Sequence, residues 1–389
     1  MVDKGVEKRF FIGFLLGSEE MEEDIEVGEE ASKHRWVVMG EGRGGEEVAE
    51  CSRKPDVTQF SLSSLPMDLD KEIHLELFSV IRVYKSGRIE RLVGTDTVPA
   101  TIDPGTGVTS KDITIDTSTA LSARLYLPNL TDQPSKKLPV LVYYHGGGFC
   151  SQSAFSATYS RFINSLVAQS RLLVVSVDYR LAPEHPVPTP HDDSWAALRW
   201  VASHSGSDGP EAWLAKNGDF LRVFLAGDSA GANIAHHMAL RAGAEGLGPG
   251  IRIEGLIFLH PYFWGKEPLG SEPPIPEFRK DQELFWRLVC PGTAKGLDDP
   301  LINPLAEGAP GLEGLAGERA LVCLAEDELR ERGRAYYERL KGSGWRGEVE
   351  LFESEGEYHV FHLMKPDCHQ ALLLMERVVE FLKCKDQQS

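Results

Sequence analysis

The sequence predicts an α/β fold in which helices flank one mostly parallel central sheet. From residue 138 onwards, short apolar runs alternate with segments of helical periodicity, an order typical of parallel sheets. Several of these runs are almost wholly apolar, as expected for strands that are covered on both faces. A Gly-Asp-Ser-Ala-Gly pentapeptide at 227–231 separates one apolar run from a helical one, which indicates a strand–turn–helix unit in the middle of the chain.

Length and composition restrict the class of protein. The chain has 389 residues, 42% of them hydrophobic, which is enough for one large domain. A formal net charge of −18 argues against nucleic acid or an anionic membrane as partner and suits a neutral small-molecule substrate. No apolar run reaches the ~18 residues that a membrane-spanning helix needs. The oligomeric state stays open.

The six cysteines are scattered and form no C-x-x-C pair, and no histidines accompany them at zinc spacing. They are expected to be free thiols in a reducing compartment, and we expect a cytoplasmic protein that needs no metal and no cofactor.

Residues 1–66 differ from the rest of the chain. An apolar run at 10–16 is short for a signal peptide and is followed by an acidic block at 19–24, which also argues against an organellar transit peptide. We expect a disordered N-terminal extension, with Met67 as a possible alternative start, and a catalytic domain over 67–389.

The first part of the domain is predicted to contain a small lid and several half-exposed strands. Residues 73–77 are interpreted as a short helix belonging to a lid over the site. The segments 78–84 and 88–92 form a predicted hairpin, and 111–116 and 121–127 alternate in the manner of strands.

The remaining chain supplies the main sheet and its helices. Predicted strands lie at 138–144, 172–178, 221–226, 253–259, 320–325 and 348–352. Predicted helices lie at 159–169, 192–204, 232–240, 282–290, 334–340 and 371–384. The segment 261–318, rich in proline and glycine, is expected to wall a substrate pocket.

Ser229, at the centre of the pentapeptide, is the candidate nucleophile. A serine hydroxyl reacts when a base can take its proton, and a tight turn exposes it for that purpose. Gly227, Ala230 and Gly231 are small enough to flank such a turn, and the helix that follows points free N–H groups at the reacting centre. The alternative is a plain turn without chemistry, since short motifs recur by chance. The flanking strand and helix favour a nucleophile elbow.

A second glycine motif, His145-Gly146-Gly147-Gly148, directly follows the apolar strand at 138–144. Glycines allow the backbone to turn sharply and to present bare N–H groups, which a tetrahedral oxyanion requires. Together with the N–H of Ala230, the residue after the nucleophile, this motif predicts an oxyanion hole. The alternative is a flexible glycine loop.

Asp327 and His359 complete a candidate catalytic triad. Both follow predicted strands, so they should meet Ser229 at the carboxyl edge of the sheet, and the order Ser, Asp, His is that of one known triad arrangement. His359 would act as base, and Asp327 would orient its ring. The rival base is His362, and the rival acids are Glu326, Glu328, Asp298 and Asp299.

The proline-containing segment 178–186 holds three further polar candidates. Arg180, Glu184 and His185 are interpreted as members of a structural network of ion pairs and hydrogen bonds rather than as catalytic groups.

These motifs resemble the hormone-sensitive-lipase-type branch of the α/β-hydrolases, and in particular the plant carboxylesterases. Five further segments carry the resemblance, at 82–88, 94–100, 178–186, 299–304 and 356–363. The similarity extends over about 67–384. It implies an α/β-hydrolase fold with Ser229 as nucleophile, Asp327 as acid and His359 as base, and with oxyanion donors at Gly147, Gly148 and Ala230.

The sequence departs from the family pattern at two places. One residue fewer than usual separates Ala325 from the acid, and Tyr358 stands where a small or acidic residue is common. The resemblance implies a carboxylic-ester hydrolase for small to medium acyl esters. A 2-hydroxyisoflavanone dehydratase is the alternative, and so is a gibberellin-receptor-like binding protein, although those receptors lack the histidine that is present here at 359.

Overall fold

The computed structural model describes residues 68–131, 137–206, 209–272 and 275–383. The expected disordered extension and the possible start at Met67 lie outside these ranges.

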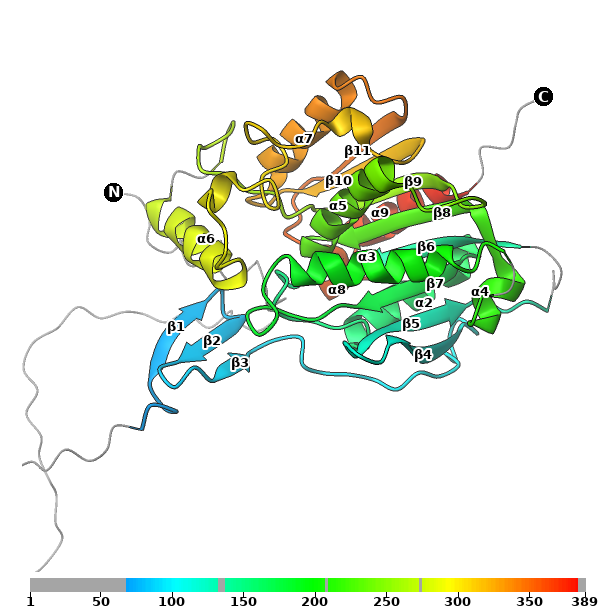
Figure 1. Ribbon diagram of the computed structural model, residues 1–389, viewed down its shortest axis with the longest axis horizontal. Coiled ribbons are helices and arrows are strands. Elements are labelled where there is room, and N and C mark those ends of the chain that lie inside the picture. The colour runs from blue at the N-terminus through cyan, green and yellow to red at the C-terminus, as the bar shows by residue number, and fades with distance from the viewer. Residues whose placement is uncertain (1–67, 132–136, 207–208, 273–274, 384–389) are drawn as a thin grey trace, which may run out of the picture.

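An eight-stranded sheet forms the centre of the molecule (Figure 1). In spatial order its strands are β11 (Glu348–Ser354), β10 (Arg319–Ala325), β9 (Ile253–Leu259), β8 (Gly218–Asp228), β6 (Leu138–Tyr144), β7 (Leu173–Asp178), β5 (Leu121–Leu127) and β4 (Thr109–Asp116). All neighbours from β11 to β7 pair in parallel, whereas β5 pairs antiparallel with both β7 and β4. The predicted mostly parallel sheet is confirmed.

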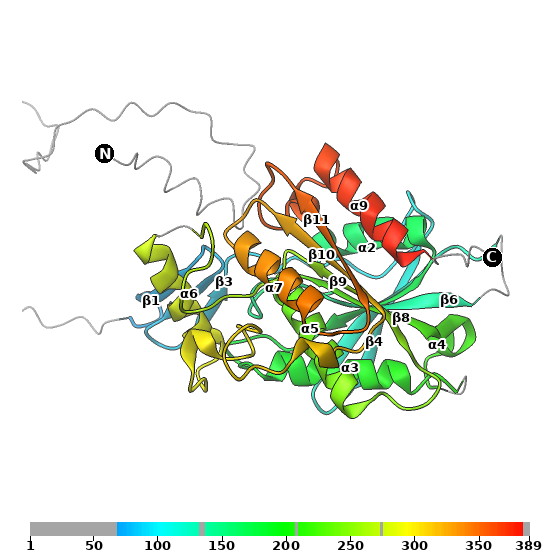
Figure 2. The ribbon, with the colours of Figure 1, turned by 90° about the horizontal axis from the view of Figure 1, so that it is seen from above.

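Helices cover both faces of this sheet. They are α2 (Ala157–Ser170), α3 (Thr189–Ala202), α4 (Ala212–Asn217), α5 (Ala230–Glu245), α7 (Arg330–Gly342), α8 (Phe361–Met364) and α9 (His369–Leu382). Figure 2 shows α2 and α9 on one face and α3, α5 and α7 on the other. Within the described residues, no helix has the length and apolarity required to cross a lipid bilayer.

The sheet separates two hydrophobic cores, and strand β6 contributes to both. Val140 and Val142 belong to the core under α3 and α5, whereas Leu141 and Tyr143 belong to the core under α2 and α9. This alternation follows from the two-residue period of a strand. It explains why the run 138–144 is apolar throughout.

A separate three-stranded antiparallel sheet lies beyond the carboxyl edge of the main sheet. It contains β1 (Ile73–Leu77), β2 (Ile81–Tyr84) and β3 (Ile89–Arg91). The predicted helix at 73–77 is therefore wrong. Its apolar residues recur at every second position, which is a strand period, and β1 pairs with β2.

The cover over the site is consequently built from this small sheet and from α6 (Pro276–Val289), not from an N-terminal helix. The two lie side by side in Figures 1 and 2. Phe78, in the turn between β1 and β2, packs edge-on against Phe285 of α6, with ring centroids 5.3 Å apart. Within the segment 261–318, which was predicted to wall the pocket, α6 supplies this wall; the helix begins at Pro276, before the predicted start at 282, and ends at Val289.

Arg91 fastens the small sheet to the main domain. Its guanidinium donates to the carbonyl of Cys150 at 2.7 Å and to that of Ala182 at 3.1 Å, and it forms an ion pair with Glu184 at 2.7 Å. Arg180 pairs in turn with Asp193 on α3 at 2.8 Å. The structural role predicted for Arg180 and Glu184 is confirmed, whereas His185 is exposed.

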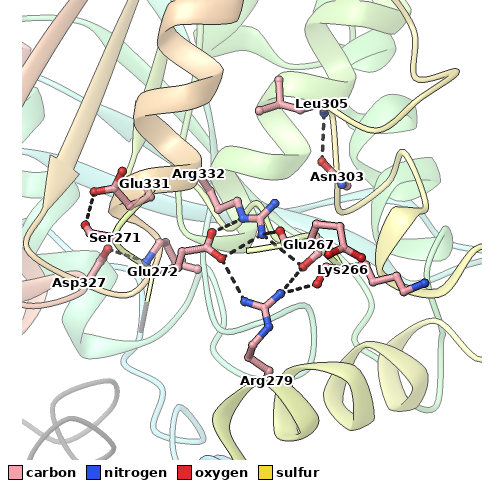
Figure 3. Close-up of polar contacts among 12 residues, drawn as sticks. Lys266, Glu267, Ser271, Glu272, Arg279, Asn303, Leu305, Asp327, Glu331 and Arg332 are labelled. Atoms are coloured by element: carbon pink, nitrogen blue, oxygen red, sulfur yellow. Dashed lines mark hydrogen bonds and ion pairs between the residues drawn. The ribbon is translucent and has the colours of Figure 1, made fainter. Parts of the chain in front are cut away.

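A buried cluster of charges holds the segment before α6 against α7. Figure 3 shows the carboxylate of Glu272 between the guanidinium groups of Arg332 and Arg279. Arg279 Nη1 and Arg332 Nη2 each donate to Glu272 Oε2 at 3.0 Å, and both side chains also reach the carbonyl of Gly265. Glu272 is 6% exposed, so this carboxylate depends on its two arginines for solvation.

Candidate active site

Ser229 lies in a sharp turn between β8 and α5. Its backbone has φ 52° and ψ −118°, a conformation that L-residues rarely adopt and that turns the side chain out of the sheet. Hydrogen bonds hold this backbone on both sides, because Ser229 N–H donates to the carbonyl of Leu259 at 2.9 Å and its own carbonyl accepts from Tyr262 N–H at 3.0 Å.

The glycines around Ser229 allow α5 to approach β6 closely. A Cβ atom at Gly231 would lie 1.9 Å from the carbonyl oxygen of Tyr144, and one at Gly227 would lie 2.3 Å from the carbonyl carbon of Gly231. No side chain fits at either position, so the small residues of the pentapeptide follow from packing as well as from turn geometry.

His359 and Asp327 meet Ser229 at the carboxyl edge of the sheet. His359 Nε2 lies 2.9 Å from Ser229 Oγ, and His359 Nδ1 lies 2.7 Å from Asp327 Oδ2. The His359 and Asp327 side chains are each 3% exposed. The shorter spacing after Ala325 does not prevent this contact, because Asp327 Oδ1 accepts from Leu329 N–H at 3.0 Å and the carboxylate is thereby oriented.

The rival residues have other surroundings. His362 packs edge-on against Phe162, and neither of its ring nitrogens has a hydrogen-bond partner among the described residues. Burial lowers the pKa of His362 to about 3. Glu326 accepts from Gly356 N–H, and Asp299 accepts from Thr293 and from Leu301 N–H.

Two other rival acids remain. Glu328, one residue after Asp327, has a pKa raised by burial, whereas Asp298 lies in the short helix η1 (Gly296–Asp298). Asp327, by contrast, places its carboxylate within hydrogen-bonding distance of the His359 ring.

The 145–148 loop contributes two glycines to the wall of the candidate site. Gly147 and Gly148 have φ of +93° and +61°, and both line the same cavity as Ser229 and His359. A Cβ at Gly147 would lie 2.3 Å from Ser151 O, and one at Gly148 would lie 2.6 Å from the Phe285 ring. Among the described residues, neither the N–H of Gly147 nor that of Gly148 donates a hydrogen bond.

Buried tyrosines and Asp228 fix the start of this loop. The Tyr159 hydroxyl accepts from Gly146 N–H at 2.7 Å and donates to Asp228 Oδ2 at 2.8 Å, while the Tyr143 hydroxyl donates to Asp228 Oδ1 at 2.8 Å. Burial raises the pKa of Asp228 to about 6, although both tyrosine hydrogen bonds act in the opposite direction. His145 stacks on the Tyr179 ring at 4.2 Å, and burial lowers its pKa.

A cavity of about 380 Å³ opens above Ser229. Phe78 and Val80 of the turn between β1 and β2, Phe285 of α6 and Tyr358 line it, so its walls come from distant parts of the chain. Gln282, also in the wall, is fully buried and accepts from the Tyr262 hydroxyl at 2.8 Å. The described residues contain no group of three side chains suited to hold a metal ion.

His260 was not predicted to belong to the site, although it follows β9 and lies beside His359. Its ring is 6.0 Å from that of His359, and its Nδ1 accepts from Val360 N–H at 3.0 Å. Its position in the sequence could have indicated this, because His260 directly follows the predicted strand at 253–259 and such positions lie at the carboxyl edge of the sheet.

Comparison with known proteins places this fold in a family. A model of the α/β-hydrolase fold matches residues 141–363, more than half of the chain, and the chain therefore belongs to the α/β-hydrolases. The esterase of Pyrobaculum calidifontis has a similar structure, with a TM-score of 0.59 and 29% identity over 70% of this chain and 84% of that one.

Plant proteins are more similar in sequence. The probable carboxylesterase 13 of Arabidopsis thaliana is 46% identical, covering 81% of this chain and 99% of that protein. The 2-hydroxyisoflavanone dehydratase of Glycyrrhiza echinata is 47% identical, covering 82% of this chain and 99% of that protein. The chloroplastic tuliposide A-converting enzyme 1 of Tulipa gesneriana is 49% identical, covering 86% of this chain and 84% of that protein. The chain is thus a carboxylesterase-type α/β-hydrolase related to these plant enzymes.

The tulip relatives correct the expected cytoplasmic location, because their names place them in chloroplasts or amyloplasts. The expectation rested on free thiols, and the four cysteines in the described part (Cys150, Cys290, Cys323 and Cys368) are indeed unpaired. Free thiols indicate a reducing compartment but do not distinguish the cytoplasm from the interior of a plastid.

Proposed function

We propose that this protein hydrolyses carboxylic esters with small to medium acyl groups, using Ser229 as nucleophile, His359 as general base and Asp327 as the partner of His359. The observation that carries the proposal is the pair of hydrogen bonds from Ser229 Oγ to His359 at 2.9 Å and from His359 to Asp327 at 2.7 Å. These distances lie within the range required of a nucleophile, a base and an orienting carboxylate.

In the acylation step, Ser229 Oγ attacks the ester carbonyl carbon while His359 Nε2 takes the hydroxyl proton. The negative charge that develops on the carbonyl oxygen is stabilised by the N–H groups of Gly147, Gly148 and Ala230. Asp327 keeps the proton on His359 Nδ1 and stabilises the imidazolium that forms. The intermediate collapses, the C–O bond to the alcohol breaks, and His359 returns the proton to the departing alcohol.

Deacylation repeats these steps with water. His359 takes a proton from the water molecule, whose oxygen attacks the acyl carbon, and the same N–H groups stabilise the second oxyanion. The bond to Ser229 Oγ then breaks, and His359 reprotonates the serine. The products are a carboxylic acid and the free enzyme.

The decisive experiment is Ser229→Ala assayed with p-nitrophenyl acetate. Loss of the nucleophile should lower kcat by on the order of 10³-fold or more, because the remaining groups cannot form the acyl-enzyme. His362→Leu is the matched control, since His362 is a buried histidine of the same segment without a contact to Ser229 in the described structure. Turnover in Ser229→Ala at the wild-type rate would refute the proposal.

A dehydratase is the second candidate, because the Glycyrrhiza relative with that name is 47% identical along nearly its whole length. A dehydratase would remove water from a 2-hydroxyisoflavanone without consuming an ester. Incubating purified protein with that substrate and following loss of water by mass spectrometry distinguishes the two. Those dehydratases that carry threonine as nucleophile differ from Ser229, which favours hydrolysis here.

The names of the tulip relatives further lead us to propose a plastid location for this chain. The full chain fused at its C-terminus to a fluorescent protein should accumulate inside plastids of leaf cells. Diffuse fluorescence throughout the cytoplasm would contradict this proposal without bearing on the chemistry.

A further inference from the structure

The four residues that leave β9, from Leu259 to Tyr262, contact the backbone on both sides of the candidate site. Leu259 accepts from Ser229 N–H and Tyr262 donates to Ser229 O, as described above. Between them, His260 donates its own backbone N–H to Cys323 O of β10 at 2.8 Å, and its side chain accepts from Val360 N–H at 3.0 Å. One short segment therefore holds the backbone of the nucleophile and that of the residue after the base.

The hydrogen bond to Val360 fixes the state of the His260 ring. A backbone N–H can only donate, so Nδ1 must offer its lone pair and the ring proton must lie on Nε2. His260 is 1% exposed, and burial with its histidine neighbours at 362 and 359 keeps its pKa well below the ordinary value. The ring is thus neutral at physiological pH and remains an acceptor. It also stacks on Phe361 at 5.5 Å, which restrains its orientation.

Val360 needs this restraint. Its φ of 50° is left-handed, and for a β-branched residue such a conformation is strained and persists only where the surroundings enforce it. The conformation immediately follows His359 and directs the chain into α8. If Val360 relaxed, the Cα–Cβ direction of His359 would rotate away from Ser229.

We propose that His260 is a positioning residue for His359, acting through Val360 N–H to hold the imidazole within bonding distance of Ser229 Oγ. His260 is not among the residues that line the cavity, so it acts on the base and not on the substrate. The proposal rests on the hydrolase function argued above and adds a residue that the predicted triad does not include.

The test compares two substitutions of His260. Asn places its amide oxygen near the position of Nδ1 and keeps an acceptor, whereas Leu removes it. His260→Leu should lower kcat by about 10- to 100-fold, because a misplacement near 1 Å has effects of this size, while KM stays within about twofold. His260→Asn should recover most of kcat. His362→Leu, which removes the neighbouring buried imidazole, should leave kcat unchanged.

A second measurement does not depend on turnover. In the wild type, the His359 Nδ1 proton shared with Asp327 should give a far-downfield proton NMR resonance. We expect this resonance to persist in His260→Asn and to shift or broaden in His260→Leu. If His260→Leu does not fold, His260→Gln replaces it, because the longer amide reaches the Nε2 position and leaves Val360 N–H without its acceptor.

The outcomes separate this proposal from the proposed function. Wild-type kcat and an unchanged resonance in His260→Leu would overturn the positioning role, and so would equal losses in the Asn and Leu variants at equal stability. A fully active Ser229→Ala would instead overturn the hydrolase function, while the resonance would still report whether His260 positions His359.

Discussion

At the scale of single residues, the buried carboxyl of Asp228 is the most unusual group beside the candidate nucleophile. Its two tyrosine donors, Tyr143 and Tyr159, come from β6 and α2, so Asp228 links the 145–148 loop to both elements. Sequence reasoning treated it only as the variable residue of the pentapeptide. Its role in supporting Gly146 depends on side chains 69 and 85 positions away in the chain, which no local pattern reveals.

Asp228 should make a pH-dependent contribution to stability. Its pKa rises from 3.8 in the unfolded chain to about 6 in the folded protein, so the folded state binds the proton more tightly and stability falls as the pH rises between these values. Below about pH 4 Asp228 is protonated in both states and does not destabilise the fold. Above about pH 6 it is ionised in both states, and the cost of burying its charge is fully present. The free energy of unfolding of the wild type relative to Asp228→Asn should therefore decrease by up to ~3 kcal/mol across this window.

Urea unfolding of both proteins at several pH values measures this difference. Subtracting one free energy of unfolding from the other removes the pH-dependent contributions of the carboxylates that both proteins contain. A constant difference from pH 4 to pH 7 would show that Asp228 titrates normally in the folded state.

Gly231 gives a second prediction at this scale. Gly231→Ala would place a methyl group 1.9 Å from Tyr144 O, which only a displacement of α5 from β6 can relieve. Such overpacking should destabilise the protein by about 3 kcal/mol or prevent folding, with loss of activity. Gly342→Ala is the control, because nothing lies within 4 Å of that Cβ, and it should be neutral or slightly stabilising. Thermal unfolding of both variants measures the difference in their stability. Equal melting temperatures would contradict the prediction.

At the scale of elements, the main sheet was predictable because its strands carry strong local signals. The predicted segment 138–144 coincides with β6, and 253–259 coincides with β9, since both are buried on two faces and read as continuous apolar runs. The candidate residues Ser229, Asp327 and His359 could be selected for the same reason, because each of them follows a predicted strand.

The cover was predicted less well. In 73–77 the alternation of apolar residues was the signal that predicts a strand. The turn that brings β2 beside β1 contains no glycine, although Phe78 and Ser79 both have positive φ, and the sequence therefore gives no sign of this turn. The Glu272 cluster could not be predicted at all, because its three charged residues come from separate segments and resemble surface residues in the sequence. Their burial is a property of the tertiary structure.

This cluster yields a prediction for α6. Glu272→Gln removes the charge between Arg332 and Arg279, and leaving two arginines uncompensated in a buried site should destabilise the protein by about 3–5 kcal/mol. KM for ester substrates should also rise, because Phe285 of α6 lines the cavity. Urea unfolding and steady-state kinetics measure the two effects.

Glu283→Gln is the matched control for that experiment. Glu283 pairs with Arg287 on the same helix, but its side chain is 48% exposed, so the loss should stay below about 1 kcal/mol. Equal effects of the two substitutions would mean that the buried cluster does not hold α6.

At the scale of the whole molecule, the cavity between the small sheet, α6 and the main domain limits the substrate. Each additional methylene that is buried in its apolar wall should raise kcat/KM by about fourfold, corresponding to ~0.8 kcal/mol. Across p-nitrophenyl acetate, butyrate, hexanoate, octanoate and dodecanoate, we expect a rise for the short esters and then a plateau or a fall, since the cavity holds about 380 Å³. A steady rise up to dodecanoate would show that the cover opens further than this structure indicates.

The division of this cover between distant parts of the chain has a consequence for biosynthesis. Phe78 leaves the ribosome 207 residues before Phe285 (285 minus 78), and His359 emerges later still. Because domains assemble as the polypeptide emerges, Phe78 makes its ring contact with Phe285 only after α6 has been synthesised. The cavity that these three residues line is therefore completed only late in synthesis.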